Sequence, residues 1–212
     1  MVRISLSSIH NSKFEMSKLT LVGFSHRRMH DPACPGKMIA ETRPSLSICG
    51  MDIKPVKSHK FLGVVFDQEL HWNVQAKRTI AKATKWTLAS HRLARLAVGI
   101  SLRQMRQLYQ AITVPSFTYA ADVWFTPVCR GVDSGMSSGS IGVARKLSTI
   151  QRMATMAITG ALRTSTSDVM EAHANLLPIE LTMDRVCHRA ALCLAALLES
   201  HPLSKPVHQS AR

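Results

Sequence analysis

Between Leu70 and Ala121 the chain runs for 52 residues without an Asp or Glu, and this stretch constrains the fold more than any other feature. The eight Lys and Arg residues in it are Lys77, Arg78, Lys82, Lys85, Arg92, Arg95, Arg103 and Arg106. A helix formed here has a polar face of one sign, which repels itself and is stabilised by a polyanion. The whole chain is also basic, with 27 Lys and Arg against 13 Asp and Glu and a net charge of +14. This balance favours nucleic acid or an anionic membrane surface as a partner.

The cysteines and apolar tracts narrow the class of protein. There are five cysteines, an odd number, and no CxxC pair, so neither a disulfide framework nor a zinc ribbon is indicated. The apolar tract from Val186 to Leu198 is interrupted by His188 and Arg189 and is too short to span a bilayer. The N-terminus lacks the long apolar region of a signal peptide. We therefore expect an intracellular protein, nuclear or cytoplasmic, that is neither secreted nor membrane-bound.

Residues 1–69 favour short β-strands. Lys18–Phe24 is a strand candidate, and the polar segment Ser25–Arg43 that follows is predicted to be a loop. Two short apolar runs on either side of Gly50 predict a hairpin. Phe61–Phe66 is predicted to be a third strand.

After Asp67 the hydrophobic period changes from two to 3.6, which predicts helices. The first helix is expected from Asn73 to Gly99, with Arg78, Lys82, Lys85 and Arg92 opposite an apolar stripe. That stripe is predicted to contain Trp72, Ala76, Ile80, Ala83, Trp86 or Thr87, Leu93 and Ala97, with both Trp side chains in the core.

A second helix is expected to begin at Ser101, which forms a capping box with Gln104, and Pro115 should end or kink it. Residues 131–142 hold four Gly and four Ser and indicate a flexible linker or long loop. Helices are expected over 143–200. The stripe of the last one is predicted to be Met183, Cys187, Ala190, Leu194 and Leu197.

The predicted architecture is α+β: a small β region at 1–69, a helical region at 70–130, the linker at 131–142, a second helical region at 143–200, and a frayed tail at 201–212. We see no adjacent pair of carboxylates of the kind that holds two catalytic metal ions. Asp67 and Glu69 are interpreted as part of a strand-to-helix turn. We assign no catalytic residue and no metal ligand.

Several segments, taken in order, resemble the reverse transcriptases of LINE-type (non-LTR) retrotransposons. Among these, the resemblance is to the Tad-like elements of fungi. The first is Lys57–Asp67 followed by Leu70-His71-Trp72, and the second is Gly99–Trp124. The others are Ile150-Gln151-Arg152 with Ile158–Ala161, and Glu171-Ala172 with Leu176–Ile179. The resemblance covers nearly all of the chain from Lys18 to Pro206.

The resemblance implies the end of a polymerase palm near Lys18–Phe24, a primer-grip-like element at Phe61, Leu62 and Gly63, a helical thumb from Asn73 to about Phe125, and a connection region from Val143. The family uses Mg²⁺ held by aspartates that would precede this chain. We therefore expect no cofactor in this chain, and a missing palm and fingers in the same or another chain.

The sequence hypothesis is a fragment of an RNA-directed DNA polymerase that lacks the catalytic aspartates. It is expected to be inactive alone and to bind an RNA–DNA hybrid, RNA or other nucleic acid. The expected contacts are Lys77, Arg78, Lys82, Lys85, Arg92, Arg95, Arg103 and Arg106. The alternatives are a non-enzymatic basic helical module that binds nucleic acid or protein, and a transposon relic without function.

Overall fold

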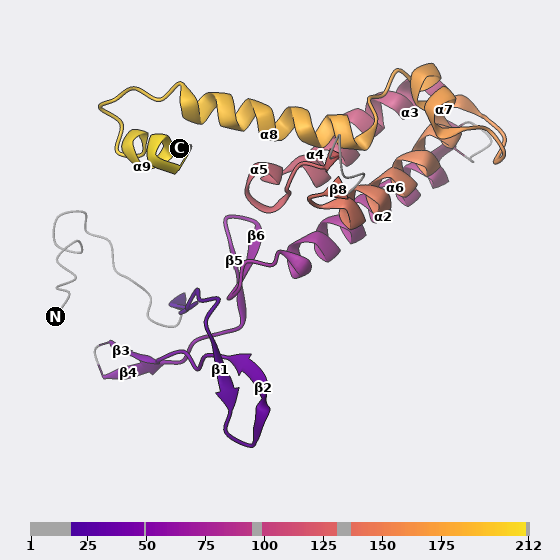
Figure 1. The fold of residues 1–212 in the computed structure, drawn as a ribbon. Coiled ribbons are helices and arrows are strands. Elements are labelled where there is room, and N and C mark those ends of the chain that lie inside the picture. The colour runs from indigo at the N-terminus through magenta and orange to yellow at the C-terminus, as the bar shows by residue number, and fades with distance from the viewer. Residues whose placement is uncertain (1–17, 49, 95–98, 131–136, 211–212) are drawn as a thin grey trace. The chain divides into compact units, whose positions relative to one another are not determined.

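The computed structural model describes residues 18–48, 50–94, 99–130 and 137–210. The fold is α+β, with small antiparallel hairpins followed by helices (Figure 1). The chain divides into two compact units, Met1–Trp72 (unit 1) and Asn73–Arg212 (unit 2). Within the described ranges, no helix is both long and apolar enough to cross a membrane.

The described residues of unit 1 form three two-stranded antiparallel hairpins. They pair β1 (Arg28–Asp31) with β2 (Cys34–Ala40), β3 (Leu46–Ile48) with β4 (Met51–Ile53), and β5 (Ser58–Phe61) with β6 (Val64–Asp67). The hairpin expected around Gly50 is confirmed as β3–β4, and Gly50 has a φ of 79° that suits glycine.

The predictions for the first part of unit 1, Lys18–Arg43, are wrong. The segment expected to be a loop, Ser25–Arg43, contains the β1–β2 hairpin, and the strand expected at Lys18–Phe24 is reduced to one bridge between Leu21 and Pro55. The reason lies in Arg43, which donates hydrogen bonds to the carbonyl oxygens of Gly23 (2.7 Å), Ser25 (2.9 Å) and Glu41 (3.0 Å). One side chain thus satisfies backbone carbonyls that a strand partner would otherwise satisfy.

The strand predicted at Phe61–Phe66 is also wrong, because the chain reverses inside it. Leu62 (φ 46°) and Gly63 (φ 86°) form the two-residue turn between β5 and β6. Positive φ at both central residues is the type I′ arrangement that matches the twist of a hairpin. Glycine adopts such angles freely, whereas for a leucine they cost about 1–2 kcal/mol.

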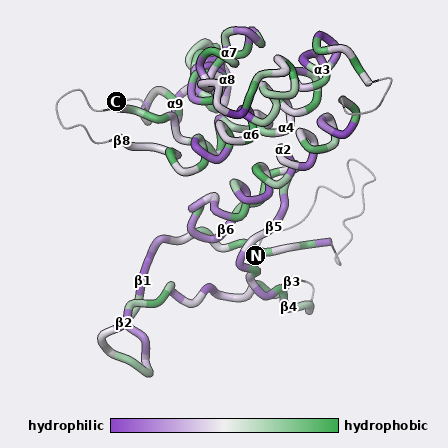
Figure 2. The backbone as a smooth tube through the Cα atoms, turned by 90° about the vertical axis from the view of Figure 1, so that its right-hand side faces the viewer, coloured by the Kyte–Doolittle hydropathy of each residue, from purple (hydrophilic) through white to green (hydrophobic). Residues whose placement is uncertain are grey.

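Unit 2 is helical. Its main helices are α2 (Asn73–Ala94), α3 (Leu102–Leu108), the π-helical turn η2 (Tyr109–Thr113), α4 (Val114–Thr118), α5 (Ala121–Trp124), α6 (Ile141–Thr159), α7 (Ser167–Ala174), α8 (Ile179–Ala195) and α9 (Ser204–Ser210). Helix α6 contacts α2, α3, α7 and α8, and α2 and α8 lie on opposite sides of the layer made by α4 and α6 (Figures 1 and 2). Hydrophobic and hydrophilic bands alternate along these helices in Figure 2, as expected of helices with one packed face.

Helix α2 packs through small residues. Ala76, Ala83 and Thr87 are buried, whereas Trp86 is 37 % exposed, so the prediction that Trp86 lies in the core is wrong. Ala and Thr allow α2 to approach α6 and α4 closely, and the bulky indole is displaced to the flank of the contact. Trp72 is partly buried against Phe66, with ring centroids 5.2 Å apart.

The helix that follows Ser101 begins as predicted and then continues past its proline. The capping box is confirmed: Gln104 N donates to Ser101 Oγ (3.3 Å), and Ser101 N donates to Gln104 Oε1 (2.9 Å). Pro115 does not end the helix, since the wider turn η2 precedes it and the helix continues as α4. A π-helical turn changes the local register, and this is one way for a helix to accommodate a proline.

The second half of unit 2 differs from expectation at both ends. The last residues of the predicted linker are ordered, since β8 (Ser137–Ser138) pairs with β7 (Cys129–Arg130) and α6 begins at Ile141. A side chain at Gly139 would clash with the carbonyl oxygen of Pro127.

In α8, Met183 is buried as predicted but Leu194 is 44 % exposed. The tail predicted to be frayed contains α9.

The core of unit 2 is held together by a buried polar network centred on Gln151 of α6. The Tyr109 hydroxyl donates to Gln151 Oε1 (3.0 Å), and Gln151 Nε2 donates to Glu171 Oε1 (2.8 Å) and to the Leu177 carbonyl oxygen (2.9 Å). Tyr109, Gln151 and Glu171 are all buried. Burial, together with the Glu171 carboxylate, raises the pKa of the Tyr109 phenol well above its ordinary value.

We predict that Gln151→Met lowers the free energy of unfolding by roughly 3 kcal/mol, because it leaves the Glu171 carboxylate and the Tyr109 hydroxyl buried without this partner. Urea denaturation monitored by circular dichroism measures the change. The matched control is Gln107→Met, at an exposed glutamine of α3, and it should change stability little. Equal effects of the two substitutions would contradict a structural role for the network.

Stability should also fall at alkaline pH because of Tyr109. Its pKa is raised in the folded state, so its contribution is complete below the ordinary tyrosine value near 10 and is lost as the pH rises towards the folded-state value. The loss is about 1.4 kcal/mol per pH unit above that ordinary value. Urea titrations at several alkaline pH values should show a shallower decline for Tyr109→Phe than for the native chain. Tyr119→Phe, at a tyrosine that is 55 % exposed, is the control and should decline as the native chain does.

Candidate nucleic-acid interface

Four predicted binding residues share one exposed face of α2. Arg78, Lys82, Lys85 and Arg92 are exposed, and at 3.6 residues per turn they lie within an arc of about 80°. We call these four residues the cationic face. It lies opposite the buried residues Ala83 and Thr87, so packing of α2 in unit 2 turns these side chains to solvent. Lys77 is exposed too, about a quarter-turn away from them.

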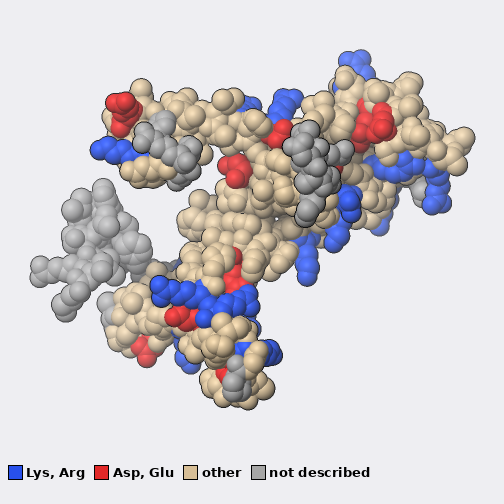
Figure 3. All heavy atoms as spheres, viewed as in Figure 1, with Lys and Arg blue, Asp and Glu red and all other residues tan. Residues whose placement is uncertain are grey.

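The charge of this face is not balanced locally. Helix α2 contains no Asp or Glu, and neither does the sequence from Leu70 to Ala121. Figure 3 shows Lys and Arg side chains along the edge of unit 2 where α2 runs. A row of like charges on a rigid helix produces a positive potential that attracts a polyanion.

The remaining predicted contacts lie elsewhere. Arg103 is exposed on α3. Arg106 is half-buried, and its Nη2 donates to the Asn175 carbonyl oxygen (3.2 Å), which holds it against the loop after α7. Arg95 lies outside the described residues. The structure therefore brings together on one face only part of the set that the sequence grouped.

Trp86 was predicted to lie in the core, but it is exposed and lies beside the cationic face. Trp86 is 37 % exposed, and Lys85 Nζ lies 6.0 Å from the centroid of its ring. A cation near an aromatic face is a weak attraction at an exposed position. An exposed indole beside a cationic row is also a surface on which an unpaired base can stack.

The primer-grip-like residues form the exposed tip of the β5–β6 hairpin in unit 1. Phe61 is 60 % exposed and Leu62 is 75 % exposed, and Gly63 completes the turn. The tip is therefore apolar and projects from the hairpin. This conformation depends on the left-handed backbone at Leu62 and Gly63.

The acidic residues near the strand-to-helix junction serve structure. Asp67 accepts hydrogen bonds from the backbone N–H groups of His71 (2.9 Å) and Trp72 (3.0 Å), as the sequence interpretation of a turn expected. Glu69 Oε2 pairs with Arg28 Nη2 (3.3 Å) and lies 3.2 Å from His71 Nδ1. Across the described parts of the chain, no group of three His, Cys, Asp or Glu residues is arranged to hold a metal ion.

One cysteine has an altered acidity. Burial raises the pKa of the Cys187 thiol, and the carboxylates of Asp122 and Asp184 raise it further. The thiolate is the reactive form of cysteine, so this environment makes Cys187 a poor nucleophile.

Comparison with known proteins adds no relative: no protein family, no curated protein and no solved structure matches this chain. The structural basis for a function is therefore the chemical character of the cationic face and of the hairpin tip.

Proposed function

We propose that this chain binds nucleic acid through the cationic face of α2, as the thumb-containing part of a LINE-type reverse transcriptase. The ligand that fits the proposal is an RNA–DNA hybrid or RNA, held by its phosphate backbone. In this hypothesis the chain contributes binding and not catalysis, and the Mg²⁺-dependent chemistry belongs to another part of the polymerase.

The observation that carries the proposal is the geometry of the cationic face. From Arg78 to Arg92 the helix rises about 21 Å, at 1.5 Å per residue. Phosphates along one strand of a duplex are spaced about 3.4 Å apart along its axis. A helix of this length therefore tracks about six base pairs, and four cations along it suit contacts with a phosphate backbone that carry no sequence information.

The packing of unit 2 supports the resemblance on which the polymerase hypothesis rests. Tyr109, Gln151, Glu171 and Leu177 come from three separate segments that resemble the family, and they meet in one hydrogen-bonded network. Short sequence similarities that arose by chance would have no reason to share one buried cluster. A non-enzymatic binding module remains the second hypothesis, and it uses the same cationic face.

We predict that Lys82→Glu/Lys85→Glu/Arg92→Glu weakens binding to an RNA–DNA hybrid by about a hundredfold or more, because three attractive contacts become repulsive. For the native chain, the logarithm of the binding constant should fall with the logarithm of salt concentration with a slope of about −3.6, as four phosphate contacts require. Fluorescence anisotropy with a labelled hybrid, measured over a range of salt concentrations, tests both values.

The control carries the same change of charge at another place. Arg145→Glu/Lys146→Glu/Lys205→Glu replaces three exposed residues of α6 and α9 and should retain most of the binding. Equal loss in the two triple variants would mean that net charge, and not the cationic face, governs binding. Undiminished binding of the α2 variant at low salt would contradict the proposal outright.

A further inference from the structure

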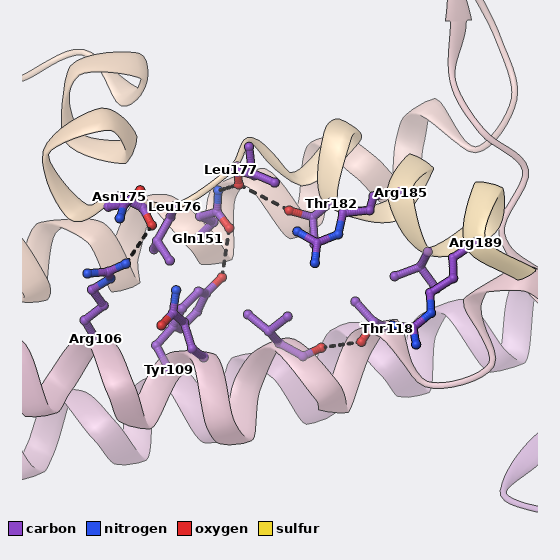
Figure 4. Close-up of a pocket in the computed structure, with 13 residues that line it drawn as sticks. Arg106, Tyr109, Thr118, Gln151, Asn175, Leu176, Leu177, Thr182, Arg185 and Arg189 are labelled. Atoms are coloured by element: carbon purple, nitrogen blue, oxygen red, sulfur yellow. Dashed lines mark hydrogen bonds between the residues drawn. The ribbon is translucent and has the colours of Figure 1, made fainter.

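A second basic site lies in unit 2, on the side of the α4–α6 layer that faces α8. It is a cleft of about 540 Å³ between the η2–α4 helix and α8 (Figure 4). Arg106 lines one end, Arg185 and Arg189 of α8 line the other side, and Tyr109 and Gln151 lie between them. We call it the arginine cleft. Because α2 lies on the opposite side of the layer, this cleft is separate from the cationic face.

The guanidinium groups of the three arginines in the arginine cleft make few of the hydrogen bonds that they could donate. Arg106 Nε is buried without a hydrogen-bond partner, although Nη2 of the same side chain contacts the Asn175 carbonyl oxygen. Arg185 and Arg189 are one helical turn apart on α8, and neither guanidinium group makes a hydrogen bond or ion pair with another residue of the described ranges. Figure 4 shows both side chains extending from α8 towards the cleft.

No carboxylate balances these cations within the cleft. Among the residues that the structure describes, none that lines the cleft is an Asp or Glu. The nearby Glu171 carboxylate is buried and accepts its hydrogen bond from Gln151, and Asp184 of α8 lies 3.8 Å from His188. Cations that line one cleft without a counter-charge favour an anionic ligand, which also supplies acceptors for the unmade hydrogen bonds of the α8 arginines.

Guanidinium groups fit phosphate well, because each presents parallel N–H donors to two oxygens. The cleft is much larger than a phosphate ion and falls within the range of about 300–1,000 Å³ typical of small-molecule sites. Val114, Leu176 and Val186 add apolar surface to its lining. We propose that the arginine cleft binds a nucleotide-sized organic phosphate, with Arg185 and Arg189 at its phosphate group and Arg106 at the opposite end of the ligand.

The experiment is an isothermal titration of the full chain with adenosine 5′-monophosphate, inorganic phosphate and adenosine. The monophosphate should bind saturably and more tightly than inorganic phosphate, and adenosine should not bind. Arg185→Gln/Arg189→Gln should lower the affinity for the monophosphate by about tenfold or more, since two charged contacts are lost. Because both side chains are exposed, the variant should keep its helical circular dichroism.

A crossed control separates this proposal from the one made for α2. Arg78→Gln/Lys82→Gln removes two charges at the same helical spacing. It should weaken binding of the hybrid and leave binding of the monophosphate unchanged. The α8 variant should show the opposite pattern. Monophosphate binding that is unchanged in the α8 variant, or equally weakened in both variants, would overturn the arginine cleft without touching the α2 proposal. Absence of saturable binding by the native chain at millimolar monophosphate would overturn it as well.

Arg106→Lys provides a second variant in which the charge is kept and the planar fork is lost. Arg106→Lys should lower the affinity for the monophosphate, and full retention of that affinity would exclude Arg106 from the site. The source of the phosphate is settled by competition with a short unpaired strand that carries a 5′-phosphate. Displacement of the monophosphate by this strand, but not by the same strand without the phosphate, identifies a strand end as the ligand. If both strands compete equally weakly with the monophosphate, the ligand of the cleft is a free nucleotide.

Discussion

The structure of unit 2 depends on the hydrogen bonds of one buried glutamine. Gln151 lies on α6, the helix that contacts α2, α3, α7 and α8, and it joins Tyr109, Glu171 and the carbonyl oxygen of Leu177. A buried carboxylate is tolerated only where its hydrogen bonds are made, so Gln151 also fixes where α7 lies. Both candidate binding surfaces are built on helices that pack against this centre.

Arg152, the next residue, extends the same organisation to a loop. Its guanidinium donates to the carbonyl oxygens of Arg163 (2.7 Å) and Ser165 (2.8 Å) and to the Ser167 hydroxyl (2.8 Å). These bonds hold the segment that connects α6 to α7. Arg152 is thus a cation committed to structure, in contrast to the exposed arginines of α2 and α8.

The parts of the fold that local chemistry controls could be predicted from the sequence. The Ser101–Gln104 capping box and the turn at Gly50 each depend on residues a few positions apart. The setting of α2 could not be predicted, because a helical pattern shows which face is apolar but not which residues allow the closest approach of a neighbour. Trp86 belongs to the apolar pattern, yet Thr87 occupies the contact.

The candidate sites follow the same distinction. Exposure of Lys and Arg is the usual state of these residues, so the cationic face of α2 could be predicted from spacing alone. The arginine cleft could not, because Arg106 and Arg185 are far apart in the chain and meet only through the packing of α8. The single local sign of the cleft was the one-turn spacing of Arg185 and Arg189 on a predicted helix. Tertiary structure, and not composition, separates the two basic surfaces.

The turn at Leu62 has a consequence for any partner that meets the β5–β6 hairpin. A leucine held at a φ of 46° keeps about 1–2 kcal/mol of conformational energy at an exposed tip. A partner that grips the tip and lets Leu62 move to an ordinary backbone conformation recovers this energy as affinity. Since about 1.4 kcal/mol corresponds to a tenfold change in a binding constant, this energy amounts to a preference of about five- to thirtyfold for partners that remodel the hairpin over partners that accept it as it is.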